Sequence, residues 1–135
     1  MRKNLSNKQI EKYSRQIVLK NVGTIGQKKI LKSNVLVVGA GGLGCPVIDY
    51  LSRAGVGRLG IIDYDKIDPS NIHRQSIYTF KDVGKYKVDV LKKKIMDINP
   101  DVKTKIFKSK ITNKNVDKIL KQFDIIIDGS DNFKT

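Results

Sequence analysis

Residues 35–44 read VLVVGAGGLG, and the organisation of the whole chain follows from this stretch. Four apolar residues that favour strands run directly into a glycine cluster, and the amphipathic run 45–54 follows. The local prediction is a strand, a tight turn and a helix. Glycines let the backbone approach a ligand closely, and the free N–H groups that open a helix carry partial positive charge. The pattern is therefore typical of a turn that binds phosphate.

An acidic residue follows the glycine cluster at an informative distance. A second apolar segment, residues 59–62, ends at Asp63, which lies 19 positions after Gly44. This spacing is close to that of the carboxylate that binds ribose hydroxyls in nucleotide-binding folds. A glycine cluster alone is also compatible with a plain packing turn, in which Asp63 would be a solvated strand end. The two features together favour a nucleotide site.

Length and composition fit one domain. The chain has 135 residues, of which 39% are hydrophobic, enough to bury a core. No apolar run approaches the roughly 20 residues of a membrane-spanning helix, and the polar residues 1–9 do not resemble a signal peptide. We therefore expect a cytoplasmic protein without a membrane partner. The single cysteine, Cys45, excludes an internal disulfide and is expected to pack rather than to react.

The formal net charge of +14 would ordinarily suggest a nucleic-acid partner. However, 22 of the 27 basic residues are lysines scattered along the chain, and no interleaving of aromatic and basic residues occurs. This distribution favours a solvated surface over a nucleic-acid groove. The positive field would still attract anions such as ATP or an acidic protein.

Helical and strand patterns alternate along the rest of the chain. Helices are expected at 6–18, 25–31, 45–54, 84–98 and 113–120, and strands at 35–38, 59–63, 102–107 and in the apolar part of 123–132. The alternation predicts an α/β, Rossmann-like three-layer fold with a mainly parallel sheet. Residues 1–32 are expected to form an N-terminal helical segment, and residues 33–135 the nucleotide-binding domain.

Polar residues are concentrated after the predicted strands. They are Asp63, Asn71, Arg74 and Asp131, with Lys87 on the helix that follows the second strand. Ligands of open α/β sheets bind at the carboxyl ends of the strands, so we expect these residues to lie near the glycines. Backbone N–H groups and cations can hold phosphates, and a carboxylate can hold Mg²⁺. No GxxxxGK[ST] sequence is present, so the pattern is not that of a P-loop hydrolase.

Several ordered motifs resemble one known family. They are YSRQI (13–17), VLVVGAGGLGCPV (35–47), AGVGRLGIIDYDKID (54–68), SNIHRQ (70–75), VGKYKVDVLKKKIMDINP (83–100) and IIIDGSDNF (125–133). The chain resembles the ubiquitin-activating-like adenylyltransferases that activate bacterial sulfur-carrier proteins for molybdopterin and thiamine biosynthesis. The resemblance spans essentially the whole chain. It implies binding of ATP with Mg²⁺ and attack of the carrier's C-terminal glycine carboxylate on the α-phosphate, which gives an acyl-adenylate.

The resemblance also implies roles for individual residues. Gly39, Gly41 and Gly42 would line the phosphate loop, and Asp63 would bind the ribose hydroxyls. Three residues would contact the triphosphate, namely Asn71, Arg74 and Lys87, and Asp131 would bind the metal. Arg15 resembles a residue that family members insert into the partner subunit's site, which implies a homodimer. The residues expected to act in catalysis are Arg15, Arg74, Lys87 and Asp131.

Family members continue nearly as far again beyond the point that matches Thr135. Their additional part carries the rest of the sheet, paired CxxC motifs for structural zinc and, in some members, a catalytic cysteine to which Cys45 does not correspond. We therefore expect a sheet truncated after its fourth strand and no zinc ligands in this chain. Two alternatives remain open: a non-catalytic ATP-binding remnant or dimerisation module, and, disfavoured by the polar SNIHRQ segment, a nicotinamide-dependent dehydrogenase.

Overall fold

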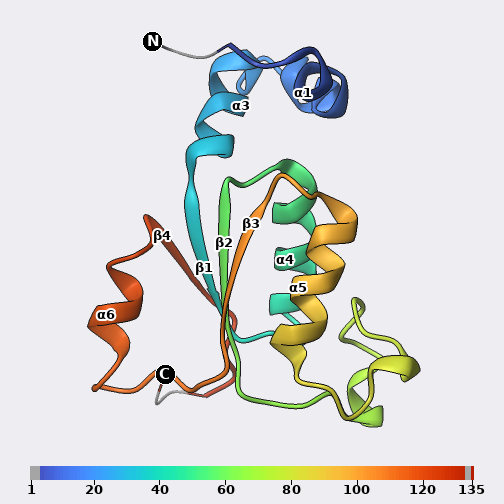
Figure 1. Ribbon diagram of the computed structural model, residues 1–135, viewed down its shortest axis with the longest axis vertical. Helices are drawn as coiled ribbons and strands as arrows, with labels where there is room; N and C mark the ends of the chain where they lie inside the picture. The colour runs from blue at the N-terminus through green and yellow to red at the C-terminus, as the bar shows by residue number, and fades with distance from the viewer. Residues whose placement is uncertain (1–3, 133–134) are drawn as a thin grey trace.

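A four-stranded parallel sheet forms the centre of the computed structural model, which describes residues 4–132 and 135 (Figure 1). Its strand order is β3-β2-β1-β4. The strands are β1 (Asn34–Val38), β2 (Arg58–Ile62), β3 (Lys103–Phe107) and β4 (Ile125–Asp128). All three pairings between neighbouring strands are parallel. Phe133, the last residue of the IIIDGSDNF motif, lies outside the described residues.

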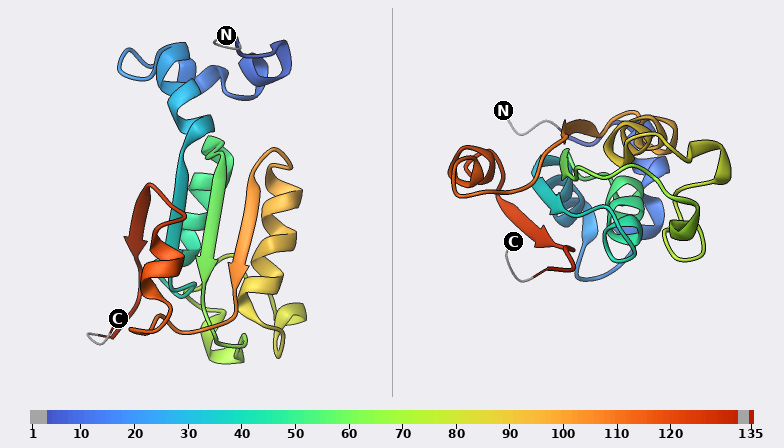
Figure 2. Two further views of the ribbon diagram at one scale, coloured as in Figure 1. Left: turned by 60° about the vertical axis from the view of Figure 1, so that its left-hand side comes forward. Right: turned by 90° about the horizontal axis from the view of Figure 1, so that it is seen from below.

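Helices cover both faces of this sheet. The covering helices are α4 (Gly44–Ala54), α5 (Lys87–Ile98) and α6 (Val116–Leu120). The helices α1 (Asn7–Lys12), α2 (Ser14–Ile17) and α3 (Gly23–Lys32) lie beyond one end of the sheet, and η1 (Pro69–Asn71) and η2 (Phe80–Asp82) are 3₁₀ turns. Figure 2 shows α4 and α5 on one side of the strands and α6 on the other. The predicted α/β, Rossmann-like architecture with a parallel sheet is therefore confirmed.

The two cores follow from the alternation of side chains along the strands. In β1, Val35 and Val37 point into the larger core with α4 and α5, whereas Leu36 and Val38 point to the opposite core. Phe123, just before β4, packs in that second core. Successive side chains of a strand face opposite sides, so a strand buried on both faces is a continuous apolar run. This explains why VLVV carries no polar residue.

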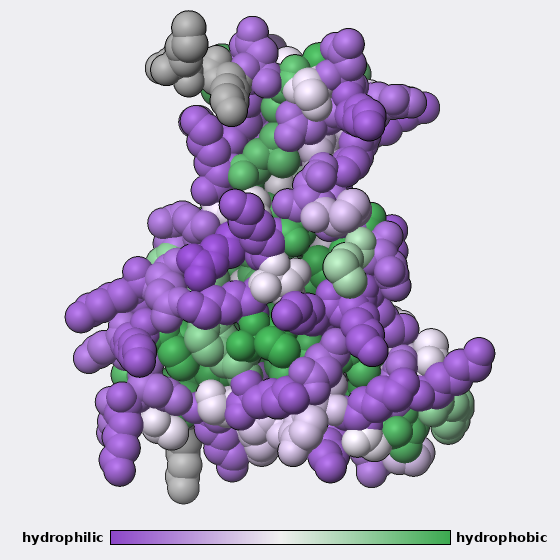
Figure 3. Space-filling model, in the orientation of Figure 1, coloured by the Kyte–Doolittle hydropathy of each residue, from purple (hydrophilic) through white to green (hydrophobic). Residues whose placement is uncertain are grey.

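The edge strand β4 is less covered than β1. Ile125 and Ile126 expose 50% and 40% of their surface, although they belong to an apolar run. Figure 3 shows hydrophilic side chains over most of one face, with hydrophobic side chains gathered over the middle of its lower part. The lysine-rich surface expected from the sequence is thus interrupted over the sheet.

Three predicted helix boundaries were wrong. The helix expected at 6–18 breaks at Tyr13, whose side chain is buried and which separates α1 from α2. The helix expected from residue 84 begins at Lys87, because Gly84 adopts a left-handed φ of 85° that ends a turn. The helix expected from Asn113 begins at Val116, and Asn115 instead accepts a hydrogen bond from the Thr112 N–H.

The most buried positions of α4 are offset from those predicted. Val47 and Leu51 do pack against the larger core, as expected, but they and Ala54 are only half-buried. The buried residues of α4 are Gly44, Cys45, Ile48 and Ser52. They recur at helical spacing, shifted by about one residue from the predicted positions. The helix therefore presents its smallest residues to the sheet where it leaves the glycine loop, which brings that loop close to the strands.

The N-terminal helices cap the far end of α4. The Gln16 and Gln27 Nε2 groups donate to the Ala54 carbonyl at 3.1 and 3.0 Å. The last carbonyls of a helix have no partner within the helix, so these side chains satisfy one of them. Figure 1 places α1 and α3 at the opposite end of the sheet from the glycine loop. No helix among the described residues is long and apolar enough to cross a membrane.

Candidate nucleotide-binding site

The glycine loop connects the carboxyl end of β1 to the first turn of α4. Gly39 has a φ of 87°, a conformation that residues with a Cβ rarely adopt. A Cβ on Gly39 would lie 2.9 Å from the Gly129 carbonyl oxygen, and one on Gly44 would overlap the Gly39 carbonyl. The loop is therefore closed against both α4 and the turn after β4. This close approach requires glycine at these two positions.

Asp63 joins the second loop to the glycine loop. Its Oδ2 accepts a hydrogen bond from the Ala40 N–H at 2.8 Å, and its Oδ1 accepts one from the Asp65 N–H at 2.8 Å. A carboxylate has about four acceptor sites, so two remain for other donors. Asp63 is only half-buried, which leaves these sites accessible to hydroxyl groups of a ligand. The location fits the predicted contact with ribose.

Arg74 lies over the glycine loop. A Cβ placed on Gly42 would be 3.7 Å from the Arg74 Cγ and 3.9 Å from its Nε. The Arg74 Nη1 also donates to the Ser70 carbonyl at 3.1 Å, which fixes the side chain along its own loop. The structure thus brings the Arg74 side chain beside Gly42, one of the three predicted phosphate-loop glycines.

Lys87 is buried at the start of α5, with 5% of its surface exposed. Its Nζ lies 3.7 Å from the Asp65 Oδ2, and Asp65 is in turn bound to Asp63 through its N–H. A buried ammonium needs a counter-charge, and the exposed Asp65 supplies a weak one at this distance. Lys87 is therefore held at the edge of the loop cluster with positive charge available to an anion.

The other predicted residues are placed less directly. Asn71 lies in η1, where its Oδ1 accepts from the Asp68 N–H at 3.0 Å, so only its Nδ2 group is left to donate to a ligand. Arg15 is exposed on α2, at the other end of the sheet from the glycine loop. Within one chain the structure does not bring Arg15 to the site.

Asp131 follows β4 and lies two residues beyond Gly129, the neighbour of Gly39. It lines an open hollow together with Asp128, Ser130, Asn132 and Thr135. Carboxylate, hydroxyl and amide oxygens are the donors that Mg²⁺ takes, usually one or two carboxylates plus phosphate oxygens. These residues fit a magnesium ion bound with a nucleotide. No cluster of three or more His, Cys, Asp or Glu side chains occurs within residues 4–132 and 135.

Cys45 opens α4 beneath the glycine loop. Its Sγ is buried and faces the Ala40 carbonyl at 3.4 Å. Burial raises the pKa of this thiol to about 11, so it remains protonated at neutral pH. The environment agrees with the expected packing role and not with a nucleophile.

Two residues near the loop could not be identified from the sequence. Gln75 and Tyr78 are both 3% exposed, and they lie under Gly41 and Ala40 respectively. Gln75 ends the SNIHRQ motif, but an uncharged side chain gives no sign of a role. The position of Tyr78 depends on how the long second loop folds back, which no local pattern reveals.

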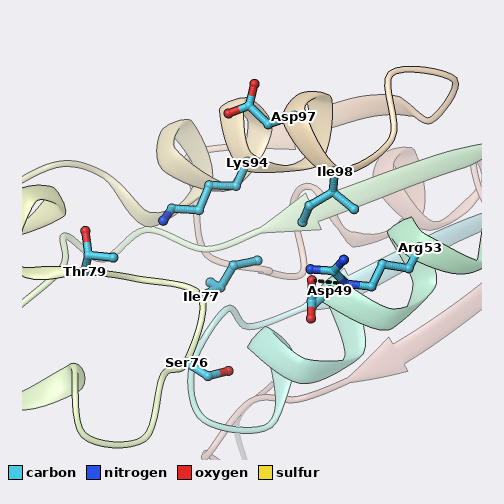
Figure 4. Close-up of a pocket in the computed structure, with 8 residues that line it drawn as sticks. All are labelled: Asp49, Arg53, Ser76, Ile77, Thr79, Lys94, Asp97 and Ile98. Atoms are coloured by element: carbon cyan, nitrogen blue, oxygen red, sulfur yellow. Dashed lines mark hydrogen bonds and ion pairs between the residues drawn. The ribbon is translucent and has the colours of Figure 1, made fainter.

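A separate hollow lies between α4, α5 and the residues that follow Gln75 (Figure 4). The Arg53 Nε binds the Asp49 Oδ1 at 2.9 Å across one turn of α4. On the other wall, the Lys94 Nζ lies 3.4 Å from the Oδ2 of Asp82, a residue of η2. This hollow contains none of the predicted site residues.

Comparison with known proteins identifies the family of this chain. The model of the ThiF family matches residues 13–135. The sulfur carrier protein adenylyltransferase of Thermus thermophilus is 42% identical over 130 residues, which are 96% of this chain and 48% of that protein. The chain thus spans about half the length of this curated relative.

Two solved structures are also similar. The crystal structure of PaaA has a TM-score of 0.85 and 31% identity, with coverage of 95% of this chain and 42% of PaaA. The crystal structure of Escherichia coli MccB with ATP has a TM-score of 0.73 and 28% identity, with coverage of 79% of this chain and 32% of MccB. The second of these proteins is described with ATP bound.

Proposed function

Because this chain belongs to the ThiF family, we propose that it binds ATP and activates the C-terminal carboxylate of a small ubiquitin-like sulfur-carrier protein as an acyl-adenylate. The observation that carries the proposal is the position of Asp63 and Arg74 at the glycine loop, with Lys87 paired to Asp65 beside Asp63, at the carboxyl ends of parallel strands. Similarity to a sulfur carrier protein adenylyltransferase supports the choice of substrate.

The loop and the carboxylate would bind the two ends of the nucleotide. The N–H groups that open α4 would face the phosphates, since a helix N-terminus attracts anions. The free acceptor sites of Asp63 would bind the ribose hydroxyls. Arg74 and Lys87 would lie beside the phosphates, with the Nδ2 of Asn71 as a further donor. This arrangement would leave the α-phosphate accessible from the open side of the loop.

The reaction would then be a displacement at the α-phosphorus. A carboxylate oxygen of the carrier forms a bond to that phosphorus, and the bond to the bridging oxygen breaks, so that pyrophosphate leaves with the electron pair. Arg74 and Lys87 would stabilise the negative charge that develops on the phosphate oxygens. Asp131, with Asp128, would hold Mg²⁺, which supplies further positive charge to the triphosphate when bound.

Arg15 would act from a second subunit. Its position on α2, remote from the glycine loop of its own chain, is compatible with insertion into a partner's site. We therefore include a homodimer in the proposal. The division of the chain into an N-terminal helical segment (1–32) and a nucleotide-binding domain (33–135) likewise remains a prediction. The two parts are in contact, because Gln16 on α2 and Gln27 on α3 both donate to the Ala54 carbonyl at the end of α4.

The direct test is exchange of labelled pyrophosphate into ATP with a carrier that ends in glycine. We expect exchange that depends on both Mg²⁺ and the carrier. Asp131→Asn should lower the exchange rate at least ~100-fold while changing ATP affinity less than about threefold. Asp97→Asn is the matched control, because Asp97 is exposed on α5 and lines the separate hollow that contains none of the predicted site residues. ATP binding without any carrier-dependent exchange would reject the enzyme and favour an ATP-binding module.

A further inference from the structure

Ala40 is the residue of the glycine loop whose backbone is held on both sides. Its carbonyl accepts a hydrogen bond from the Tyr78 hydroxyl at 2.8 Å and is also faced by the Cys45 thiol at 3.4 Å. Its N–H is held by Asp63. The backbone N–H and the backbone carbonyl of Ala40 are thus both held by side chains from outside the loop. Tyr78 is 3% exposed, so water cannot compete for this bond.

Gln75 provides a second and independent observation. Its Nε2 lies 3.6 Å from the point that a Cβ on Gly41 would occupy. Its Oε1 is fully buried and has no hydrogen-bond partner among the residues that the structure describes. Buried acceptors without a partner destabilise a fold and are uncommon. An apolar side chain of similar volume would fill the same space without this cost.

Glycine loops are intrinsically flexible, because glycine has the widest range of backbone conformations. A flexible loop loses conformational entropy when it binds a ligand, and this loss weakens affinity. Fixing Ala40 removes part of that loss, since Gly39 and Gly41 are its direct neighbours. The amide of Gln75 lies beside Gly41, the next residue of the loop.

We propose that Tyr78 and Gln75 are positioning residues that hold the glycine loop in the conformation that binds the triphosphate. Tyr78 acts through the Ala40 carbonyl, and Gln75 acts through its amide beside Gly41. The inference rests on the proposed binding of ATP to this loop. It adds two residues that contact the loop from below and do not contact the carrier carboxylate.

Two variants separate this role from simple packing. Tyr78→Phe removes only the hydroxyl, and Gln75→Met keeps the volume but removes the amide, both its unpartnered oxygen and the nitrogen beside Gly41. If Gln75 only fills space, Gln75→Met leaves ATP affinity unchanged and keeps or raises the melting temperature. If it positions the loop, the same variant weakens ATP binding without lowering the melting temperature. Tyr50→Phe, on the exposed side of α4, is the matched control.

The experiment combines hydrogen exchange with binding of ATP and adenosine. For Tyr78→Phe we expect residues 38–44 to exchange at least ~5-fold faster without nucleotide, with β3 unchanged as an internal reference. For both variants we expect the Kd for Mg²⁺ATP to rise ~10-fold and that for adenosine to change less than about twofold, because the loss lies at the phosphates. Tyr50→Phe should match the wild type in every measurement.

Loop exchange equal to wild type in Tyr78→Phe, or ATP affinity within about twofold of wild type in both variants, would overturn the inference. A wild-type protein that binds no ATP would reject the proposed function instead. In that case the exchange of residues 38–44 alone decides whether Tyr78 holds the loop. The two failures are therefore distinguishable.

Discussion

The Asp63 carboxylate accepts a hydrogen bond from the Ala40 N–H at 2.8 Å, and this bond joins the loops that follow two neighbouring strands. Parallel pairing places Val38 opposite Ile62, so the residues just beyond each strand are adjacent. The acidic residue that follows β2 is therefore next to the glycine loop for a geometric reason. One carboxylate orders the loop and still has acceptor sites for a ligand.

Gly44→Ala should destabilise the fold. The added Cβ would overlap the Gly39 carbonyl, so the loop and the first turn of α4 must move apart. We expect the free energy of unfolding in urea to fall by ~1–3 kcal/mol. Gly41→Ala is the control, since its Cβ would make only an ordinary contact with Gln75 and should cost less than ~1 kcal/mol. Equal losses in the two variants would contradict the close packing described for Gly44.

Lys87→Ala should weaken ATP binding more than any substitution of a surface lysine on the same helix. Lys87 is buried beside Asp65, whereas Lys92 is exposed on α5. A charged hydrogen bond to phosphate corresponds to ~10-fold to 100-fold in affinity, which is the loss expected for Lys87→Ala. Lys92→Ala should change the Kd less than about twofold. Similar effects of both substitutions would mean that the net charge alone attracts the nucleotide.

Arg15→Ala should abolish carrier-dependent pyrophosphate exchange, and mixing this variant with a second inactive variant should restore part of the activity. Arg15→Ala and Asp131→Asn subunits would each be nearly inactive alone, but a mixed dimer contains one site with both residues intact. Random mixing makes half of the dimers mixed, so activity should return to roughly a quarter of the wild-type value. Lys20→Ala, also exposed in the N-terminal region, should remain active. Full activity of Arg15→Ala, or no recovery on mixing, would reject the role in trans.

Asp82 should make stability depend on pH in the acidic range. Burial acts to raise the pKa of this carboxyl, but hydrogen bonds from Thr79 and the charge of Lys94 outweigh burial and lower it below 3.8. A lowered pKa stabilises the fold above the unfolded value, and this stabilisation is lost as the pH falls through the folded value. At pH 7, Asp82→Asn should lower the free energy of unfolding by ~1–3 kcal/mol.

The difference in stability between Asp82→Asn and wild type should shrink as the pH falls from about 4 through the lowered pKa of Asp82, because the carboxyl is then protonated and uncharged, as the asparagine amide is. Exposed Asp97, on α5, provides the control: Asp97→Asn should follow the wild-type pH profile within ~0.5 kcal/mol. A difference for Asp82→Asn that persists unchanged at pH 2 would show that the charge of Asp82 does not stabilise the fold.

Local sequence patterns were sufficient to predict those parts of the site that lie directly after a strand. The run VLVV followed by glycines predicted β1 and its loop, and the apolar run before Asp63 predicted β2. Because the strands are parallel, knowing where each one ends also predicts which loops meet. The neighbourhood of Gly42 and Arg74 follows from the SNIHRQ motif only through the family resemblance, since that loop has no regular structure to predict.

Features that depend on tertiary contacts were not predictable. The break at Tyr13 comes from burial of its ring beside Gly55 and Asn99, which are remote in sequence. The rotation of α4 follows from the close approach of Gly44 to Gly39. Periodicity describes one helix at a time, so it cannot detect a neighbour that overrides it.

Binding of Mg²⁺ATP, compared with NAD⁺ by titration calorimetry, tests the central claim most directly. The described geometry predicts saturable binding of one Mg²⁺ATP per chain and no detectable binding of NAD⁺. Asp63→Asn should weaken ATP binding at least ~10-fold, and Asp97→Asn should leave it unchanged. Absence of ATP binding, or tighter binding of NAD⁺ than of ATP, would contradict the assignment of this loop cluster as an ATP site.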